Sequence, residues 1–472
     1  RGTTGNKPAL NVDTNLNSVT NNIIASVHDK AFGFSDKLTL LNVDKFSGSN
    51  LPSAPDSSVA YITSDYSTGH MVGDIKLAAL SDTDDTDVTG SELVTNGTFD
   101  SDTSGWSAAN DAILSVVNGA LRVTNNFSVY GRATQAISTV AGQRYTFVAT
   151  NLSGGASNNG RMYVGTSAGD ANILNVSVGY KNAPYAVTFT ATGSTTWVSI
   201  NCNSTGDTEY QDWDNISVRL ADSDRSVNGN GLQVHGTVTK NPVATGADLV
   251  AYSGFSTSNY LEQPYNSDLD FGTGDFSIML WAKLATSDCT AIYTGTSSSN
   301  GINVWCYGTA IKIYVAGQFM SFSSTSYIGS NFAQFTMVRK SGVVSVYTNG
   351  ELSVTVGAAG SIVYNTMKLG HGHYSGGGAV LALFRASATA PTAEQIAKIY
   401  EDEKPLFQEN AKATLYGTSD AVTALAHDDS TNLLHVGTSA GRSVFQGLRR
   451  VDNTTDAVGS CISASNNLVV ED

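Results

Sequence analysis

The stretch "GVVSVYTNGELSVTV", Gly342–Val356, predicts a β-hairpin and with it the class of fold. Apolar and polar residues alternate on both sides of Asn349-Gly350, which places one side of each strand toward a core. Asn-Gly is a favoured two-residue hairpin turn, because both residues tolerate positive φ. The same alternation recurs in "YAVTFTAT", "TTWVSINCN" and "DNISVRL". We therefore expect an all-β protein.

A helical pattern is convincing in one segment, "APTAEQIAKIYEDEKP". Thr392 and Gln395 form a capping-box pattern at its start. Ile396 and Ile399 lie on one stripe, and Pro405 ends the run. The expected fold is therefore all-β with one short C-terminal helix.

Composition and charge exclude two classes of partner. The 472 residues carry a net charge of -15, and 32 of the 41 acidic residues are Asp. Such a surface repels phosphate backbones, so we expect no nucleic-acid binding. The chain has no apolar run of about 18 residues, so we expect no membrane insertion. The chain begins with Arg1 and not with Met, so the missing signal peptide does not exclude export.

Two acidic, turn-rich segments without strand pattern divide the chain, "SDTDDTDVTG" at 81–90 and "ADSDRSVNGNG" at 221–231. The blocks that they separate have the usual sizes of β-sandwiches and jelly rolls. We therefore expect an N-terminal β flank at 1–90, a β-sandwich at 91–221, a jelly roll with its terminal helix at 222–405, and a C-terminal β flank at 406–472.

The middle block opens with "ELVTNGTFDSDTSGW" and closes with "YQDWDNISVRL". This pairing resembles the carbohydrate-binding modules found beside xylanases and glucanases, which are β-sandwiches or jelly rolls. The resemblance implies a structural Ca²⁺ held by Asp100 of the opening motif and Asp214 of the last strand. Asn118 lies in a loop that would add an oxygen ligand. Ca²⁺ takes six to eight oxygen ligands, and the sequence identifies only these.

Sugar binding needs flat aromatic rings beside amides and charged groups. Strand alternation puts Trp197 on one face with Ser199, and it puts Trp213 on the polar face of the last strand. Neighbouring rings and guanidinium groups complete the expected carbohydrate-binding set of Trp197, Trp213, Tyr130, Tyr163 and Arg161. The alternative is that loops or the second sheet cover these rings.

The second block carries four landmarks in order: "NYLEQPYNSDLDFGTGDFSIMLWAKL", "FTMVRKSGVVSVYTNGEL", "MKLGHG" and the helix "PTAEQIAKIYEDE". Together they resemble laminin-G-like, concanavalin-A-type jelly rolls. That fold hosts lectins as well as glycoside hydrolases, so the fold alone assigns no activity. The hydrolases need two carboxylates facing one bond, and no predicted strand carries such a pair. The cluster Glu401–Glu403 is expected to be solvated helix surface.

Three smaller features bear on chemistry. "VGTSAG" occurs at 164–169 and 436–441, and strand patterns rather than helices follow both copies, so Ser167 and Ser439 are expected in turns and not as nucleophiles. Cys289 and Cys306 flank a Ser/Asn/Gly turn, where opposed strands would permit a disulfide. Two buried thiols in a reducing compartment are the alternative.

The flanks resemble blades of a β-propeller, with "VGT..G" marking an inner hairpin. One blade cannot bury its faces alone, so the flanks either pair with each other or dock on further polypeptide. The run "YEDEKPLFQENAKATLYGTSDAVTALAHDDSTNLLHVGTSAGRSVFQGLRRVDNTT" is similar to predicted tail and fibre proteins of marine phages.

These resemblances imply a non-catalytic, glycan-binding structural protein of a phage virion. Its expected partners are cell-surface or extracellular polysaccharide, other virion proteins, and copies of itself, with a homotrimer natural for a fibre. A secreted bacterial polysaccharide-binding protein or glycoside-hydrolase accessory module is the first alternative. A purely structural decoration protein of the virion is the second.

Overall fold

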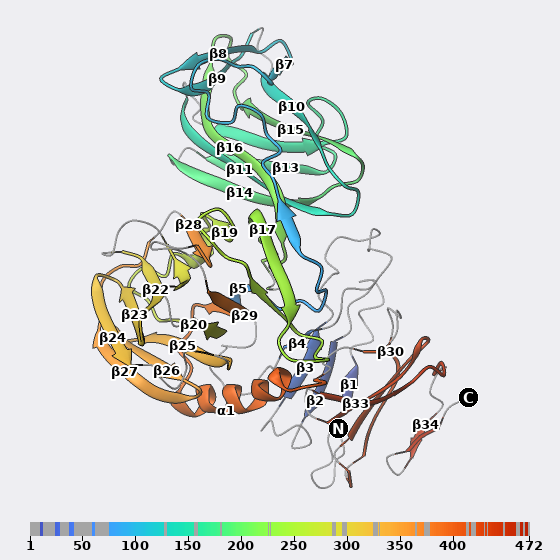
Figure 1. Ribbon diagram of the computed structural model, residues 1–472. Coiled ribbons are helices and arrows are strands. Elements are labelled where there is room, and N and C mark those ends of the chain that lie inside the picture. The colour runs from blue at the N-terminus through green and yellow to red at the C-terminus, as the bar shows by residue number, and fades with distance from the viewer. Residues whose placement is uncertain are drawn as a thin grey trace.

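The computed structural model is almost entirely β, as the alternation predicts (Figure 1). It describes the strands β1 (Leu10–Val12), β2 (Ile24–His28), β3 (Lys37–Leu41) and β4 (Val59–Tyr61). It also describes residues 75–470 apart from 127–129, 155–158, 180–181, 225, 227, 286–288, 295–299, 324–328, 330, 364–365, 372–377, 412–414, 417–421, 429, 432, 447–448, 459–462 and 466–467. No helix in this described part is long and apolar enough to cross a bilayer.

The first sandwich consists of two antiparallel sheets around one apolar core, which contains Phe147 and Ile200. One sheet has the order β13 (Leu174–Gly179), β12 (Asn159–Gly165), β15 (Thr195–Cys202), β10 (Arg132–Ser138) and β7 (Ser107–Ala109). The other has β8 (Ile113–Val117), β9 (Ala120–Thr124), β16 (Tyr210–Asp222), β11 (Arg144–Gly154) and β14 (Ala183–Thr190).

The second sandwich encloses a larger core. Its outer sheet runs β17 (Leu232–Pro242), β19 (Tyr260–Pro264), β28 (Thr366–Leu369), β21 (Cys289–Tyr293), β22 (Ile302–Tyr307), β23 (Ala310–Val315) and β24 (Gln318–Ser323). Its inner sheet runs β29 (Ala379–Ser387), β20 (Phe276–Leu284), β25 (Ala333–Lys340), β26 (Val343–Thr348) and β27 (Glu351–Gly357), with β18 (Val250–Ser253) pairing β29.

The hairpin that predicts the fold is β26–β27. Both turn residues have positive φ, 52° at Asn349 and 83° at Gly350, as an Asn-Gly hairpin turn requires. Val344 and Val346 point into the core of the second sandwich. The predicted strand periodicity and turn are therefore confirmed.

The structure differs from the expected boundary at residue 90. Strand β5 (Ile75–Ala79) pairs with β29, and β6 (Val88–Gly90) pairs with β17, so both belong to the second sandwich. The reason is burial, because Leu77 and Ala79 of β5 lie in the second core. Gly90 permits the pairing of β6, since a β-carbon there would overlap the carbonyl of Val234. The first sandwich is thus inserted between β6 and β17 of the second.

The C-terminal flank forms the expected blade-like meander of four antiparallel strands. These are β30 (Val422–Asp428), β31 (Leu433–Thr438), β32 (Gly441–Gln446) and β33 (Arg449–Thr454), followed by the hairpin β34 (Ser463–Ser465) and β35 (Leu468–Val470). Leu434 and Val436 pack with Ile396 and Ile399 of helix α1 (Ala393–Glu403). Among the described strands, β1–β4 form a separate sheet that does not pair with this meander.

The helix begins with the predicted capping box, and of its acidic end Glu401 is solvated as expected but Glu403 is not. Within Glu401–Glu403, the side chain of Glu403 is buried and ion-paired with Arg385. It also accepts hydrogen bonds from Nε1 of Trp281 at 2.7 Å and from Nε2 of Gln334 at 3.3 Å. The prediction was wrong because Glu403 falls on the apolar stripe of the helix, four residues after Ile399.

Candidate functional site

The predicted sugar-binding residues lie mainly on one face of the first sandwich. In β15, Val198 and Ile200 fill the core, so Trp197, Ser199 and Asn201 face away from it. In β12, the core residues Met162 and Val164 leave Arg161 and Tyr163 on the same outer face. β12 and β15 pair directly, and their register places Asn201 opposite Arg161 and Ser199 opposite Tyr163. We call this surface the Tyr163 face.

Tyr163 lies at the centre of this face and is only 4% exposed. The guanidinium carbon of Arg132 lies 4.1 Å from the ring centroid, and Nδ2 of Asn201 donates to the Tyr163 hydroxyl at 3.1 Å. Burial raises the pKa of the Tyr163 hydroxyl, and the charges of Arg132 and Arg161 oppose that shift. The ring is therefore a neutral, fixed part of the face and not an open stacking surface.

Two arginines supply the hydrogen-bond donors of the Tyr163 face. The backbone N–H of Arg161 donates to Oδ1 of Asn201 at 2.7 Å, and its Nη1 donates to Oδ1 of Asn175 at 2.9 Å. Nε of Arg132 is buried and has no hydrogen-bond partner among the described residues. Asn201 and Asn175 are not among the predicted residues, although the period-2 pattern of their strands places both outward.

Two further rings border this set. Tyr130 is 45% exposed and lies close enough to influence the titration of Tyr163. Trp197 is half-buried and lies opposite Ala136 on one side and Gly165 on the other. Ala136 is a small neighbour, and the position over Gly165 is occupied by Asp170 from the following turn. Four of the five predicted residues therefore belong to one face.

Trp213, the fifth, was wrongly assigned to the polar face. It is 0% exposed, lies in the core of the first sandwich and donates from Nε1 to the carbonyl of Asn201 at 3.2 Å. The reason is a bulge in β16, where the register shifts between Thr150↔Asp214 and Val148↔Ser217. Asn215 has a φ of 50° in this bulge, which breaks the alternation used for the prediction.

The predicted Ca²⁺ ligands Asp100 and Asp214 influence each other electrostatically. Burial raises the pKa of Asp214, and the negative charge of Asp100 adds to that shift. Asn118 has a φ of 54° in the turn between β8 and β9, and it makes no hydrogen bond to either carboxylate within the described part of the chain. No group of three or more His, Cys, Asp or Glu among the described residues is arranged to hold a metal. A carboxylate pair of this kind suits Ca²⁺ but supplies only part of its oxygen shell.

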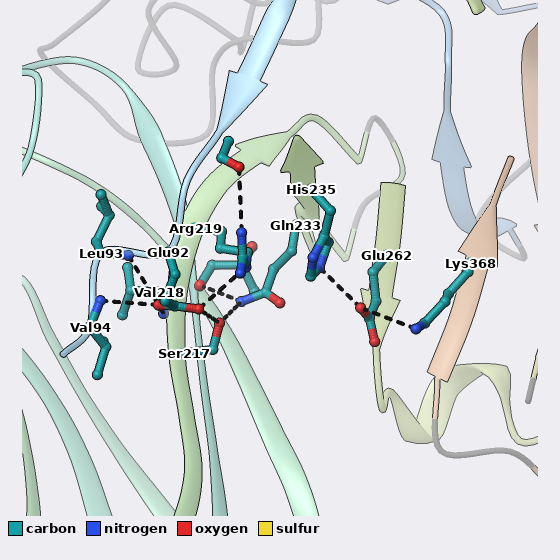
Figure 2. Close-up of polar contacts among 12 residues, drawn as sticks. Glu92, Leu93, Val94, Ser217, Val218, Arg219, Gln233, His235, Glu262 and Lys368 are labelled. Atoms are coloured by element: carbon teal, nitrogen blue, oxygen red, sulfur yellow. Dashed lines mark hydrogen bonds and ion pairs between the residues drawn. The ribbon is translucent and has the colours of Figure 1, made fainter. Parts of the chain in front are cut away.

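A polar network holds the first sandwich against the second (Figure 2). Glu92 accepts hydrogen bonds from the hydroxyl of Ser217 at 2.7 Å and from the backbone N–H of Val218 at 2.9 Å, and it pairs with Arg219 at 3.3 Å. Nε2 of Gln233 on β17 donates to the Ser217 hydroxyl at 3.2 Å. The junction is thus tied by side chains from both sandwiches.

The same figure shows a second group at this junction, on the outer sheet of the second sandwich. Nε2 of His235 lies 3.0 Å from Glu262, and the His235 ring stacks on Tyr260 with centroids 4.2 Å apart. Burial works to raise the pKa of Glu262, but His235, Lys368 and Thr366 outweigh it and hold that pKa below its ordinary value. Glu262 is thus held by Lys368, Thr366 and the neighbouring imidazole, which fits a structural junction better than a ligand site.

The other predicted features lie as follows. Ser167 donates to Oδ2 of Asp170 at 3.0 Å in the turn between β12 and β13, and Ser439 lies in the turn between β31 and β32. Neither turn leads into a helix, so neither serine has the geometry of a nucleophile elbow. Cys289 and Cys306 are directly opposed on β21 and β22, with Cα atoms 5.1 Å apart, and a disulfide joins them.

No protein-family model matches the chain, and no curated protein matches it. Among solved structures, it is similar to the receptor-binding domain of a botulinum neurotoxin C/D mosaic serotype, with 14% identity over 48% of this chain and 59% of that chain and a TM-score of 0.34. It is also similar to the receptor-binding domain of botulinum neurotoxin D, with 16% identity over 48% of this chain and 61% of that chain and a TM-score of 0.34. A third match is the binding domain of botulinum neurotoxin DC in complex with rat synaptotagmin II, with 15% identity over 53% of this chain and 66% of that chain and a TM-score of 0.31. The chain therefore spans about three fifths of the length of the first of these domains.

Proposed function

We propose that this protein is a non-catalytic carbohydrate-binding protein and that the Tyr163 face of its first sandwich holds the sugar. The observation that carries the proposal is the convergence of Trp197, Tyr130, Arg161 and Arg132 around a buried, hydrogen-bonded Tyr163. These groups come from three strands and one loop, and they combine rings with polar groups on one outer face.

The chemistry of the face suits hydroxyl-rich ligands. Trp197 and the exposed ring of Tyr130 offer flat apolar surface to the C–H side of a pyranose. The guanidinium groups of Arg132 and Arg161 present several donors in fixed directions. Asn201 and Asn175 hold Arg161 and Tyr163 in place, which lowers the entropic cost of binding.

The same face lacks what glycoside hydrolysis needs. Hydrolases place two carboxyl groups on either side of the scissile bond, about 5–9 Å apart. The five strands of this sheet carry arginines, amides and hydroxyls but no Asp or Glu, and the turn after β12 adds the single carboxylate of Asp170, beside Gly165. Binding without bond cleavage is the activity that these side chains support.

We further propose that the protein is part of a phage virion and attaches the particle to polysaccharide on the host cell surface. The resemblance of residues 400–455 to predicted tail and fibre proteins of marine phages supports this proposal. Single shallow sites bind sugars weakly, so attachment would depend on many copies acting together. Antibodies against the chain should label the tails of purified virions that encode it, and label confined to the culture supernatant would favour a secreted protein instead.

Glycan-array screening tests the binding proposal. We expect Trp197→Ala and Arg161→Ala to abolish signals that the unmodified chain gives, while Lys340→Ala, an exposed control on the second sandwich, retains them. Polysaccharide recovered after long incubation should keep its chain length. Unchanged array signals in both variants would remove the Tyr163 face as the site, and shortened polysaccharide would show that the protein is an enzyme.

A further inference from the structure

A second set of rings lies on the outer sheet of the second sandwich, far along the chain from the Tyr163 face. Trp305 of β22, Tyr314 of β23 and Phe319 of β24 come from three neighbouring strands at the edge of that sheet (Figure 1). The ring centroids of Trp305 and Tyr314 are 5.3 Å apart, and those of Tyr314 and Phe319 are 5.1 Å apart. We call this surface the Trp305 face.

The rings of the Trp305 face point away from the core because the strands alternate strictly. In β22, Ile302, Val304 and Cys306 lie in the second core, so Trp305 and Tyr307 face outward. Tyr307 is 54% exposed, and Phe319 on β24 is 49% exposed. Large rings exposed together on one face, rather than singly, point to a binding surface.

One cation lies among these rings. Nζ of Lys312 is 4.3 Å from the ring centroid of Tyr307, and Lys312 stands opposite Trp305 on one side and Ser321 on the other. No ion pair joins Lys312 to a carboxylate in the described part of the chain. Its ammonium group is therefore free to meet a negative charge brought by a ligand.

The local charge differs sharply from that of the whole protein. The chain has a net charge of -15, yet no Asp or Glu occurs between Asp288 and Glu351. This interval contains all of β22, β23 and β24. An anionic ligand would be repelled by most of this protein, whereas β22, β23 and β24 bring Lys312 and no carboxylate to the Trp305 face.

We propose that the Trp305 face is a second, separate binding site and that it takes a polysaccharide bearing carboxylate or sulfate groups. Trp305, Tyr314 and Phe319 offer their rings to the C–H sides of the sugars, and Lys312 pairs with the acidic substituent. Asn303 and Ser321, which also face outward between the rings, supply hydrogen bonds to hydroxyl groups. Rings interleaved with amide, hydroxyl and ammonium groups fit a sugar chain better than an apolar protein partner.

Affinity electrophoresis in gels containing one polysaccharide each tests the site. The probes are polygalacturonate with its methyl-esterified form, and dextran sulfate with dextran, so each anionic chain has a neutral partner of the same backbone. We expect retardation by the anionic member of at least one pair and much weaker retardation by its neutral member. Equal retardation by both members of each pair would overturn the role of the charge.

Variants then locate the binding. We expect Trp305→Ala to weaken binding by roughly tenfold or more, equivalent to about 1.4 kcal/mol. Lys312→Gln should remove the preference for the anionic chain. Phe319→Ser should also weaken binding, and because Phe319 is exposed this variant should still fold if Trp305→Ala does not. The matched control Lys340→Gln should bind as the unmodified chain does. Full binding by both Trp305→Ala and Phe319→Ser would overturn the proposal.

Variants can test the Tyr163 face and the Trp305 face separately. Trp197→Ala, on the Tyr163 face, should leave retardation by the anionic probe unchanged. Loss of that retardation in Trp197→Ala but not in Trp305→Ala would assign the anionic ligand to the first sandwich. The alternative is that a second copy of the chain covers the Trp305 face. Sedimentation of the free protein tests this, because the unmodified chain would then form dimers that Phe319→Ser dissociates.

Discussion

The indole of Trp213 lies against the backbone of Gly160, so closely that a β-carbon at residue 160 would overlap Cζ2 of the ring. Trp213 belongs to β16 in one sheet of the first sandwich, and Gly160 belongs to β12 in the other. Nε1 of Trp213 reaches the carbonyl of Asn201 on the neighbouring β15. This ring therefore packs between the two sheets, directly beneath the Tyr163 face.

Trp213→Ala should destabilise the first sandwich. Removing a fully buried Trp costs roughly 3–5 kcal/mol of unfolding free energy, because a cavity replaces packed atoms. Trp197→Ala, at a half-buried outer position, should lose far less. Equilibrium denaturation of both variants by urea tests the difference, and equal losses would contradict the burial seen here.

Gly160→Ala should also destabilise, because its β-carbon meets the indole. Combining it with Trp213→Phe, a smaller ring, should recover part of the loss, since the two residues share one contact. A double-mutant cycle measured by urea denaturation gives the coupling energy. Strict additivity of the two single changes would show that the ring and the glycine do not interact.

Chelation should lower the melting temperature of the first sandwich if Asp100 and Asp214 hold Ca²⁺. Binding to the native state alone stabilises it by about 2.7 kcal/mol when the free ion is at 100 times its Kd. Ca²⁺ should restore the melting temperature, and Asp214→Asn should abolish the response. Since burial and Asp100 raise the pKa of Asp214, the Ca²⁺ effect should also weaken on acidification. A melting temperature that changes with neither chelator nor Ca²⁺ would show that Asp100 and Asp214 do not hold this ion.

Reduction of the disulfide between Cys289 and Cys306 should destabilise the second sandwich. The sequence separation of 17 residues corresponds to a loss of about 3 kcal/mol in the loop-entropy model. We expect dithiothreitol to lower the midpoint of urea unfolding for the unmodified chain but not for a Cys289→Ser, Cys306→Ser double variant. Identical midpoints with and without reductant in the unmodified chain would argue against the bond in solution.

Asp402 should make stability fall as pH rises toward neutrality. Burial raises the pKa of Asp402 to about 7 from an ordinary 3.8, against the opposing effect of Lys398. The folded state then holds the proton more tightly than the unfolded state, so this contribution is complete below about pH 4 and is lost as pH rises through about 7. The difference in unfolding free energy between the unmodified chain and Asp402→Asn should decrease over that interval. A constant difference from pH 4 to pH 8 would contradict the raised pKa.

Local pattern sufficed for much of the architecture. The alternation and the turn at Asn349-Gly350 predicted β26–β27, and Thr392 with Gln395 predicted the start of α1. Each of these depends on interactions between residues close in sequence, such as turn geometry and helix capping. The same alternation, applied to "INVWCYGTAIKIYVAGQFMSFS", would also have placed Trp305 outward.

The predictions that failed depended on partners distant in sequence. Trp213 turns inward because of a bulge against β11, which no local pattern reveals. The spacing from Ile399 puts Glu403 on the buried stripe of the helix, but the partners that hold its carboxylate there, Arg385 and Trp281, come from β29 and β20.

The sequence by itself determined that the chain is β, where its hairpins turn and where its one described helix begins, because these follow from the φ preferences and side-chain periodicity of neighbouring residues. Only the tertiary structure decided that β5 and β6 belong to the second sandwich, with the first inserted between β6 and β17, and which rings reach the surface. Strand pairing and bulges between distant segments set both, since the register of a sheet fixes which side of each strand meets a core.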